Sequence, residues 1–134
     1  MNKACPVVLR HNNNKLDLLA FNHPNGSKQL VKGNVKKGEH IENACVRELL
    51  EESGIQAQVV KQLGSWLTED NNQTWGFCLM HYEGVLPDAW KHQTLDDGGH
   101  IFELFWQPLD SPLEGNWKKN SKHAFQYIKH AIDR

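Results

Sequence analysis

Short apolar runs separated by turn-forming clusters predict a series of strands along this chain. The runs are rich in β-branched and aromatic side chains, as strands are. Asparagine, glycine and proline gather between the runs, so the chain is expected to turn there. A stretch with little periodicity, residues 85–99, predicts a long loop. The predicted strands are residues 5–10, 16–22, 29–32, 56–66, 74–82 and 101–106.

Two stretches predict helices because their apolar residues recur at helical spacing. Residues 41–53 form the first, and Gly54 follows it where a helix commonly ends in a left-handed turn. The second lies near the C-terminus, and we expect its apolar face to pack against the sheet. The residues of this face are Phe125, Ile128 and Ile132.

The order of these elements predicts the fold class. Strands come first, a helix follows, and further strands precede the last helix, which indicates the α/β (α+β) class. We expect an α/β/α sandwich in which a mixed β-sheet lies between helices. The 134 residues suffice for one core, so the prediction is a single domain over residues 1–134.

Composition and charge narrow the classes of function. The 15 Lys and Arg against 16 Asp and Glu give a net charge of -1, which argues against DNA or an anionic membrane bound by bulk charge. The three cysteines, Cys5, Cys45 and Cys78, form no disulfide framework and are expected to be small core residues. No signal peptide or membrane-spanning run is evident, so we expect a cytoplasmic protein.

Three carboxylates cluster on the helix predicted at residues 41–53. Glu48, Glu51 and Glu52 share one face, at the spacing where like charges destabilise a helix by about 0.2–0.5 kcal/mol per pair. Arg47 is the nearby cation, so we expect a further cation to compensate these acids. Their hard oxygen ligands suit Mg²⁺, or Mn²⁺ as a substitute.

The segment matches two known phosphate- or metal-binding motifs only in part. Gly33 and Gly38 have the glycine spacing of a P-loop, but Glu39 and His40 stand where Lys and Ser/Thr are required. His40 and Glu42 match the H-x-E of a zinc deaminase, but the chain has no P-C-x-x-C segment to complete the metal site.

Residues 33–55 do fit the Nudix box, G-x5-E-x7-R-E-U-x-E-E-x-G-U, in which U is apolar. The segment therefore resembles the Nudix hydrolase family, and the strand pattern around it is similar to the rest of a Nudix domain. Nine fixed positions match, which makes chance agreement very improbable. The matching residues are Gly33, Glu39, Arg47, Glu48, Leu49, Glu51, Glu52, Gly54 and Ile55.

This resemblance implies a pyrophosphohydrolase that acts on a nucleoside diphosphate linked to another moiety. It implies that divalent ions bridge the pyrophosphate and that a metal-activated water attacks directly, without a covalent intermediate. The implied partner is a small nucleotide, such as a nucleoside triphosphate, a nucleotide sugar, a dinucleoside polyphosphate or a capped RNA end. Family members are often homodimers. The alternative is a Nudix-fold module that binds a nucleotide or RNA end without turnover.

The resemblance also implies roles for individual residues. Glu48 and Glu52 are the first candidates for metal ligands, and Glu51 is a ligand or a base that acts through water. The backbone carbonyl of Lys32 is a further ligand candidate. Glu39 and Arg47 are expected to brace the loop against the helix, while Gly33, Gly38 and Gly54 give the backbone freedom.

Outside the box, acids and one tryptophan are further candidates. Glu103 lies inside an apolar strand, where burial would suit a catalytic base, although a structural glutamate on an edge strand fits equally well. Asp96 and Asp97 are weaker alternatives in the predicted loop. Trp90 lies in the same polar stretch and is a candidate for stacking on the substrate.

Overall fold

The central sheet is mixed, as the sequence predicted. The computed structural model describes residues 1–94 and 97–133, and its first sheet has the strand order β5-β1-β7-β6. Strands β1 and β7 run parallel, whereas the other neighbours are antiparallel. The parallel pair requires a long crossover, and the chain supplies it with the first helix. The bounds are β1 (Lys3–Val7), β5 (Gly33–Asn34), β6 (Gln58–Leu67) and β7 (Thr74–His81).

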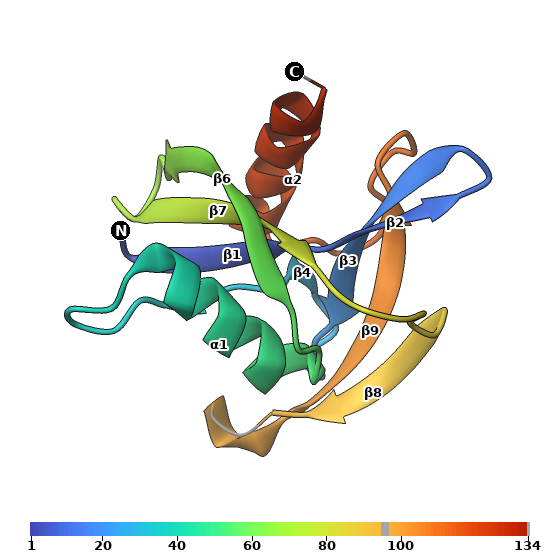
Figure 1. The fold of residues 1–134 in the computed structure, drawn as a ribbon, viewed down its shortest axis with the longest axis horizontal. Helices are drawn as coiled ribbons and strands as arrows, with labels where there is room; N and C mark the ends of the chain where they lie inside the picture. Colours follow the sequence, from blue (N-terminus) through green and yellow to red (C-terminus); the bar gives the residue numbers. More distant parts are fainter. Residues whose placement is uncertain (95–96, 134) are drawn as a thin grey trace.

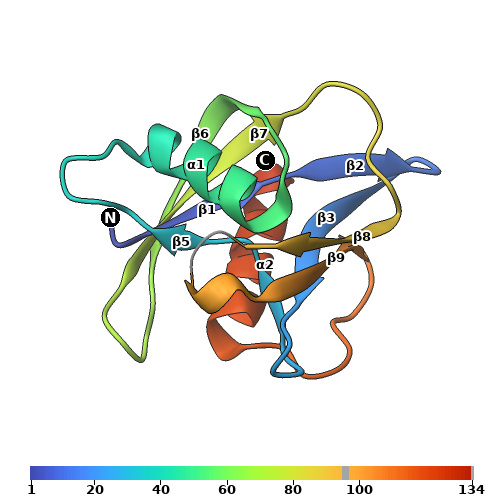
Figure 2. The same ribbon diagram turned by 90° about the horizontal axis from the view of Figure 1, so that it is seen from below.

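Two helices, α1 (Ile41–Ser53) and α2 (Lys119–Ile132), cover opposite faces of this sheet (Figures 1 and 2). Alternate residues of a strand point to opposite faces, and β1 uses both. Ala4 belongs to the apolar cluster that includes Leu49 of α1, and Val7 belongs to the cluster that includes Phe125 of α2. The α/β/α arrangement predicted from the element order is therefore confirmed.

A second, antiparallel sheet stands beside the first and was not predicted. Its order is β2-β3-β9-β8. Strand β4 also pairs with β3, on the same edge as β2 but along a different part of the strand. The prediction of one strand over residues 5–10 is wrong at Val8, where the chain passes from β1 into β2 and so from one sheet to the other. The bounds are β2 (Leu9–Asn12), β3 (Lys15–Asn22), β4 (Lys28–Leu30), β8 (Ala89–Gln93) and β9 (Ile101–Pro108).

The predicted loop over residues 85–99 is also wrong in part. Strand β8 lies within it and pairs with β9, and a short 3-10 helix covers Asp97–Gly99. β8 is an edge strand whose residues are all exposed or half-buried, so its sequence, AWKHQ, carries no apolar alternation. The three cysteines are buried, as expected. Within the part of the chain that the structure describes, no helix is long and apolar enough to cross a membrane.

Candidate active site

Helix α1 has the predicted bounds, and its ends agree with the sequence. Gly54 adopts φ 80°, and its N–H donates to the carbonyl of Leu50, which closes the helix with a left-handed cap. At the other end, the side chain of His40 makes no capping hydrogen bond with any described residue. The helix is held by packing instead, because Ala44 and Leu49 are fully buried in the core.

Two of the box carboxylates are buried at the border of this core. Glu48 and Glu52 lie one turn apart on α1, and each is only 4% exposed. Burial of a charged group is costly unless the group is paired or binds a cation. The two acids therefore need compensation from their surroundings.

Arg47 compensates part of this negative charge, and it uses all five of its N–H groups. Its Nε and Nη2 donate to the two carboxylate oxygens of Glu39 at 2.9 and 2.8 Å, and Nη2 also donates to the carbonyl of Asn34 at 2.8 Å. Nη1 donates to Glu48 Oε1 at 2.6 Å and to Glu51 Oε2 at 3.3 Å. Arg47 thus joins the loop to the helix and also offsets part of the negative charge of Glu48 and Glu51.

The carboxyl of Glu52 receives less compensation. Burial raises its pKa well above the ordinary value, and the neighbouring Glu48 raises it further. The charge and backbone of Lys32 act in the opposite direction. Among the described residues, Glu52 Oε1 has no hydrogen-bond partner although it is buried. Such an atom is rare in proteins and calls for a partner from outside the chain.

Gly33 lets the backbone approach these carboxylates. It lies in β5 and pairs with Ala4 of β1. A Cβ atom built on Gly33 would overlap the carboxylate of Glu48. Glycine is needed here because any side chain would collide with Glu48. The main chain of the preceding residue, Lys32, therefore also lies close to the two carboxylates.

Glu48 and Glu52 line a cleft of about 780 Å³, which we call the carboxylate cleft. One wall is aromatic: the rings of Phe21 and Phe102 stack with centroids 4.1 Å apart, and His23 and His100 lie 5.0 Å apart beside them. This wall was not predicted from the sequence. The remaining residues that line the cleft are Lys3, Asn25, Gln29, Lys32, Gly33, Asn34, Lys36, Arg47 and Lys118.

Lysines make the cleft cationic at its rim. Two of them are held by amides, since Lys32 Nζ donates to Gln29 Oε1 at 2.8 Å and Lys3 Nζ donates to Asn34 Oδ1 at 2.7 Å. The pKa of His23 is lowered, first by burial and then by the charges of His100 and nearby lysines. A neutral imidazole and several ammonium groups therefore face a cleft whose floor carries two carboxylates.

This donor set fits a hard divalent cation. Carboxylate oxygens of Glu48 and Glu52 lie together, and the unpartnered Oε1 of Glu52 offers a free ligand position. Over residues 1–94 and 97–133, no group of three or more His, Cys, Asp or Glu side chains is placed to hold a metal ion. Two carboxylates supplemented by main-chain oxygen and water match the ligand habits of Mg²⁺.

The structure separates the two candidate bases. Glu51 is half-buried on α1 and contacts Arg47, next to the carboxylate cleft. Glu103 is exposed on β9, opposite Lys91 of β8, and it lines a separate hollow. The expectation that Glu103 is buried is wrong, because strand alternation places Glu103 on the same outer face as Ile101.

Trp90, the candidate for substrate stacking, lies away from the carboxylate cleft. It is part of β8, and its Nε1 donates to the carbonyl of Ser53 at 2.9 Å, near the end of α1. Of the two loop acids, Asp96 lies outside the described residues, and Asp97 begins the short 3-10 helix.

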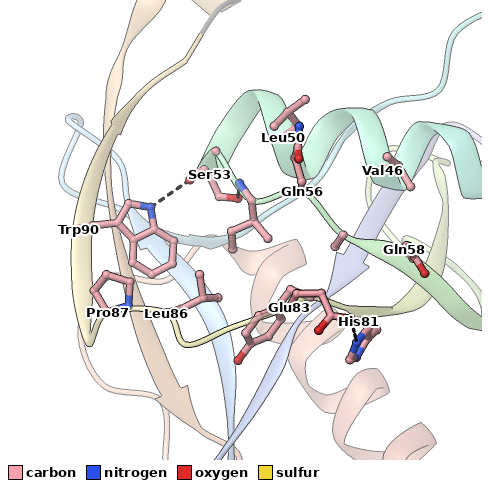
Figure 3. Close-up of a pocket in the computed structure, with 14 residues that line it drawn as sticks. Val46, Leu50, Ser53, Gln56, Gln58, His81, Glu83, Leu86, Pro87 and Trp90 are labelled. Atoms are coloured by element: carbon pink, nitrogen blue, oxygen red, sulfur yellow. Dashed lines mark hydrogen bonds and ion pairs between the residues drawn. The ribbon is translucent and has the colours of Figure 1, made fainter.

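Trp90 instead lines a second, larger cavity of about 1000 Å³ beyond the end of α1 (Figure 3). Its wall is largely apolar and includes Leu50, Leu86 and Pro87. None of the described residues that line this cavity is a box carboxylate. In the smaller carboxylate cleft, by contrast, buried acids and cationic groups line the same space.

Comparison with protein families and curated proteins gives an independent result. A family profile described as the NUDIX domain matches residues 2–128. The NAD-capped RNA hydrolase NudC of Haemophilus influenzae is 29% identical over 115 residues, which cover 81% of this chain and 41% of that protein. The chain thus spans less than half the length of this relative.

Solved structures share the fold. An ADP-ribose pyrophosphatase from Streptococcus suis superposes with a TM-score of 0.67 at 15% identity, covering 98% of this chain and 89% of that chain. The NUDIX domain of Shewanella oneidensis NrtR, complexed with ADP ribose, gives a TM-score of 0.67 at 14% identity, covering 97% and 86%. At these identities the likeness establishes the architecture alone.

Proposed function

The chain belongs to the NUDIX domain family, and from this premise we propose that it hydrolyses a pyrophosphate bond in a nucleoside diphosphate linked to another moiety, with the help of a divalent metal ion. The family assignment made from residues 33–55 is confirmed by the match over residues 2–128. We propose that the reaction takes place in the carboxylate cleft.

One observation carries this proposal: Glu52 Oε1 is buried without a described partner beside the second buried carboxylate, that of Glu48. Two buried carboxylates that bind no cation would lower the stability of the fold without serving any function. We propose that Glu48, Glu52 and the main-chain carbonyl of Lys32 hold Mg²⁺, for which Mn²⁺ can substitute. When bound, the metal neutralises phosphate charge and lowers the pKa of a bound water.

The side chains of the cleft supply the other requirements of the reaction. The ammonium groups of Lys3, Lys32 and Lys118 bind phosphate oxygens and offset their charge. Arg47 cannot take this part, because its N–H groups are all engaged with the protein. Its role is to fix the positions of Glu48 and Glu51. Glu51 then accepts the proton of the attacking water.

The aromatic wall supports a nucleotide as the substrate. A nucleobase has an aromatic face, and the imidazole rings of His23 and His100 offer a stacking surface within the same cleft as the lysines, while the stacked rings of Phe21 and Phe102 are buried behind them. The curated relative named above acts on NAD-capped RNA, and one of the structural neighbours holds ADP ribose. We propose that the substrate is a nucleotide of this general kind.

Binding without turnover is the second candidate function. It is favoured by the absence, among the described residues, of a three-residue acidic metal cluster, while the stacking wall and the lysines suffice to bind a nucleotide. The two functions differ in one respect: a hydrolase forms a product at a rate that depends on Glu52, whereas a binding module forms none.

The deciding experiment incubates the protein with Mg²⁺ and a panel that includes NAD-capped RNA, ADP-ribose and a dinucleoside polyphosphate, and identifies the products by mass spectrometry. We expect a nucleoside monophosphate product, and we expect Glu52→Gln to lower kcat about a hundredfold or more, because it removes a ligand of the charge-stabilising ion. Equal inertness of both proteins, with nucleotide binding retained, would establish the binding module instead.

A further inference from the structure

A second hollow adjoins the carboxylate cleft at the start of α2, and the proposed function does not use it. Its volume is about 340 Å³, and we call it the α2 hollow. Four residues line both spaces, namely Lys3, Gln29, Lys32 and Lys118. The two spaces therefore share one wall. The residues that line the α2 hollow alone are Asp70, Asn71, Gln73, Trp75, Lys119, Asn120 and Ser121.

The α2 hollow is cationic although the chain as a whole carries a net charge of -1. Lys119 joins Lys3, Lys32 and Lys118, which makes four lysines on its wall. Asp70 is the one acid among the described residues that line it, and this side chain is exposed to water. Such a local excess of cations favours an anionic ligand.

Unused hydrogen-bonding groups lie in the same place. Trp75 is 2% exposed, and its Nε1–H donor has no partner among the described residues. Asn120 Oδ1 is buried and lacks a described partner as well. Helix α2 begins here, and the side chain of Lys118 at its N-cap position makes no capping hydrogen bond with a described residue. The first N–H groups of α2 therefore receive no side-chain acceptor from its N-cap residue.

A phosphate group satisfies these features together. Its oxygens accept hydrogen bonds from an indole N–H, from ammonium groups and from a helix N-terminus. A water that accompanies the phosphate can donate to Asn120 Oδ1. An unsatisfied buried donor destabilises the fold, so an acceptor that reaches the Nε1–H of Trp75 removes this cost when it binds.

We propose that the α2 hollow binds a phosphate ester that the substrate carries beyond the pyrophosphate. The identification of this phosphate as part of the substrate rests on the proposed function, whereas the anion site itself does not. Two sources share this chemistry: a phosphomonoester on the ribose of a free nucleotide, and the first phosphodiester of an RNA end.

The test measures binding without metal and without turnover. The full chain is titrated with adenosine 5′-monophosphate, adenosine 3′,5′-bisphosphate and the dinucleotide pApA, and the indole N–H of Trp75 is followed by NMR. Its resonance is assigned by its loss in Trp75→Phe. We expect the second phosphate to move this resonance and to tighten binding about three- to tenfold over the monophosphate, as a charge-assisted contact does.

Two lysine variants on the same helix provide the control. Lys119→Gln changes a residue that lines the α2 hollow and not the carboxylate cleft. Lys122→Gln makes the same chemical change three residues further along α2, at an exposed position that does not line the hollow. We expect the first to remove the advantage of the second phosphate and the other to retain it. Tighter binding of pApA than of the bisphosphate would assign the phosphodiester, and the reverse would assign the phosphomonoester.

Two results would overturn the inference. One is equal affinity for all three nucleotides with an unmoved indole resonance, which would mean that the hollow holds water only. The other is an equal loss in both lysine variants, which would mean that bulk charge attracts the ligand. If the protein hydrolyses nothing but retains the Lys119-dependent advantage, the proposed function fails and the phosphate site stands.

Discussion

Arg47 and Glu39 form a bidentate ion pair between the helix and the loop that precedes it, with N–O distances of 2.9 and 2.8 Å. The hydrogen bonds from Arg47 lower the pKa of Glu39 from 4.5 to about 2, and the backbone N–H of Lys36 adds to this effect. The side chains of the pair are 21% and 15% exposed. Partial burial and fixed geometry make this pair stronger than an ordinary surface salt bridge.

The pair predicts a pH-dependent contribution to stability. Because the pKa of Glu39 is depressed in the folded state, the contribution is present above the unfolded pKa of 4.5 and is lost as the pH falls towards about 2. Glu39→Gln should therefore lower the free energy of unfolding by about 1–3 kcal/mol at neutral pH, and the difference from the wild type should shrink in that acidic window. Urea denaturation across this pH range measures it. Glu69→Gln, at an exposed turn, is the control and should change little at any pH.

Gly33 predicts a loss of activity that stability alone does not explain. In Gly33→Ala the new Cβ would overlap the Glu48 carboxylate, so this side chain must move. A displacement of about 1 Å in a catalytic group can lower the rate about a hundredfold, and we expect a loss of that order in kcat/KM. Gly38→Ala is the matched control, in the loop that follows β5. Its Cβ would meet no atom within 4 Å, but φ is +77°, so we expect a loss of about 1 kcal/mol in stability with kcat/KM preserved. Equal kinetic losses in both variants would refute the close-approach argument.

Glu52 predicts opposite effects on stability with and without metal. In a chelator the buried carboxylate of Glu52, whose Oε1 has no described partner, destabilises the fold. Because its pKa is raised, this cost grows as the pH rises above the unfolded pKa. Glu52→Gln should therefore raise Tm by a few degrees, about 1–2 kcal/mol, in a chelator. Added Mg²⁺ should raise Tm of the wild type more than that of the variant, since binding to the folded state stabilises it. Calorimetry of both proteins in both conditions checks this. An equal response to Mg²⁺ would remove Glu52 from the ligand set.

Much of the site follows from sequence because the box fixes positions on one helix. The spacing of Glu48 and Glu52 places both on one face, and the glycine after the helix gives its C-terminal cap. These local relations need only helical geometry. The further contacts of Arg47 with Glu48 and Glu51 depend on the conformation of one long side chain, which the spacing leaves open.

The aromatic wall could not be predicted in this way. Phe21 and Phe102 are 81 positions apart, and they meet only because β3 and β9 pair in one sheet. No local pattern records that pairing. Glu103 is a different case, since its alternation with Phe102 and Leu104 was visible in the sequence and already assigned it to the outer face. The burial considered for Glu103 rested on the apolar residues around it and left this alternation aside.

Trp90 predicts an effect on stability rather than on substrate binding. Its indole N–H donates to the carbonyl of Ser53, and the ring lines the cavity beyond α1 rather than the carboxylate cleft. Trp90→Phe removes this hydrogen bond and should cost about 1 kcal/mol or somewhat more. KM for a substrate identified in the panel should stay within about twofold of the wild type, since a residue outside the cleft makes no contact that KM would report. A KM that rises tenfold while Tm is unchanged would restore Trp90 as a substrate-binding residue.

Glu51 and Glu103 predict different kinetic outcomes, which decides between them as the base. Glu51 lies on α1 beside the two buried acids and is oriented by Arg47, whereas Glu103 is exposed on the outer face of β9. Loss of a general base typically lowers the rate about 10²–10⁴-fold, so we expect a loss in this range for Glu51→Gln. Glu103→Gln should retain kcat within about twofold, because an exposed side chain can be replaced with little effect on the fold. The two variants make the same chemical change, and kcat measured across pH for each separates the roles. If Glu103→Gln lost the activity and flattened the pH profile while Glu51→Gln did neither, the base would lie on β9, and the outer face of the second sheet would have to approach the bound substrate.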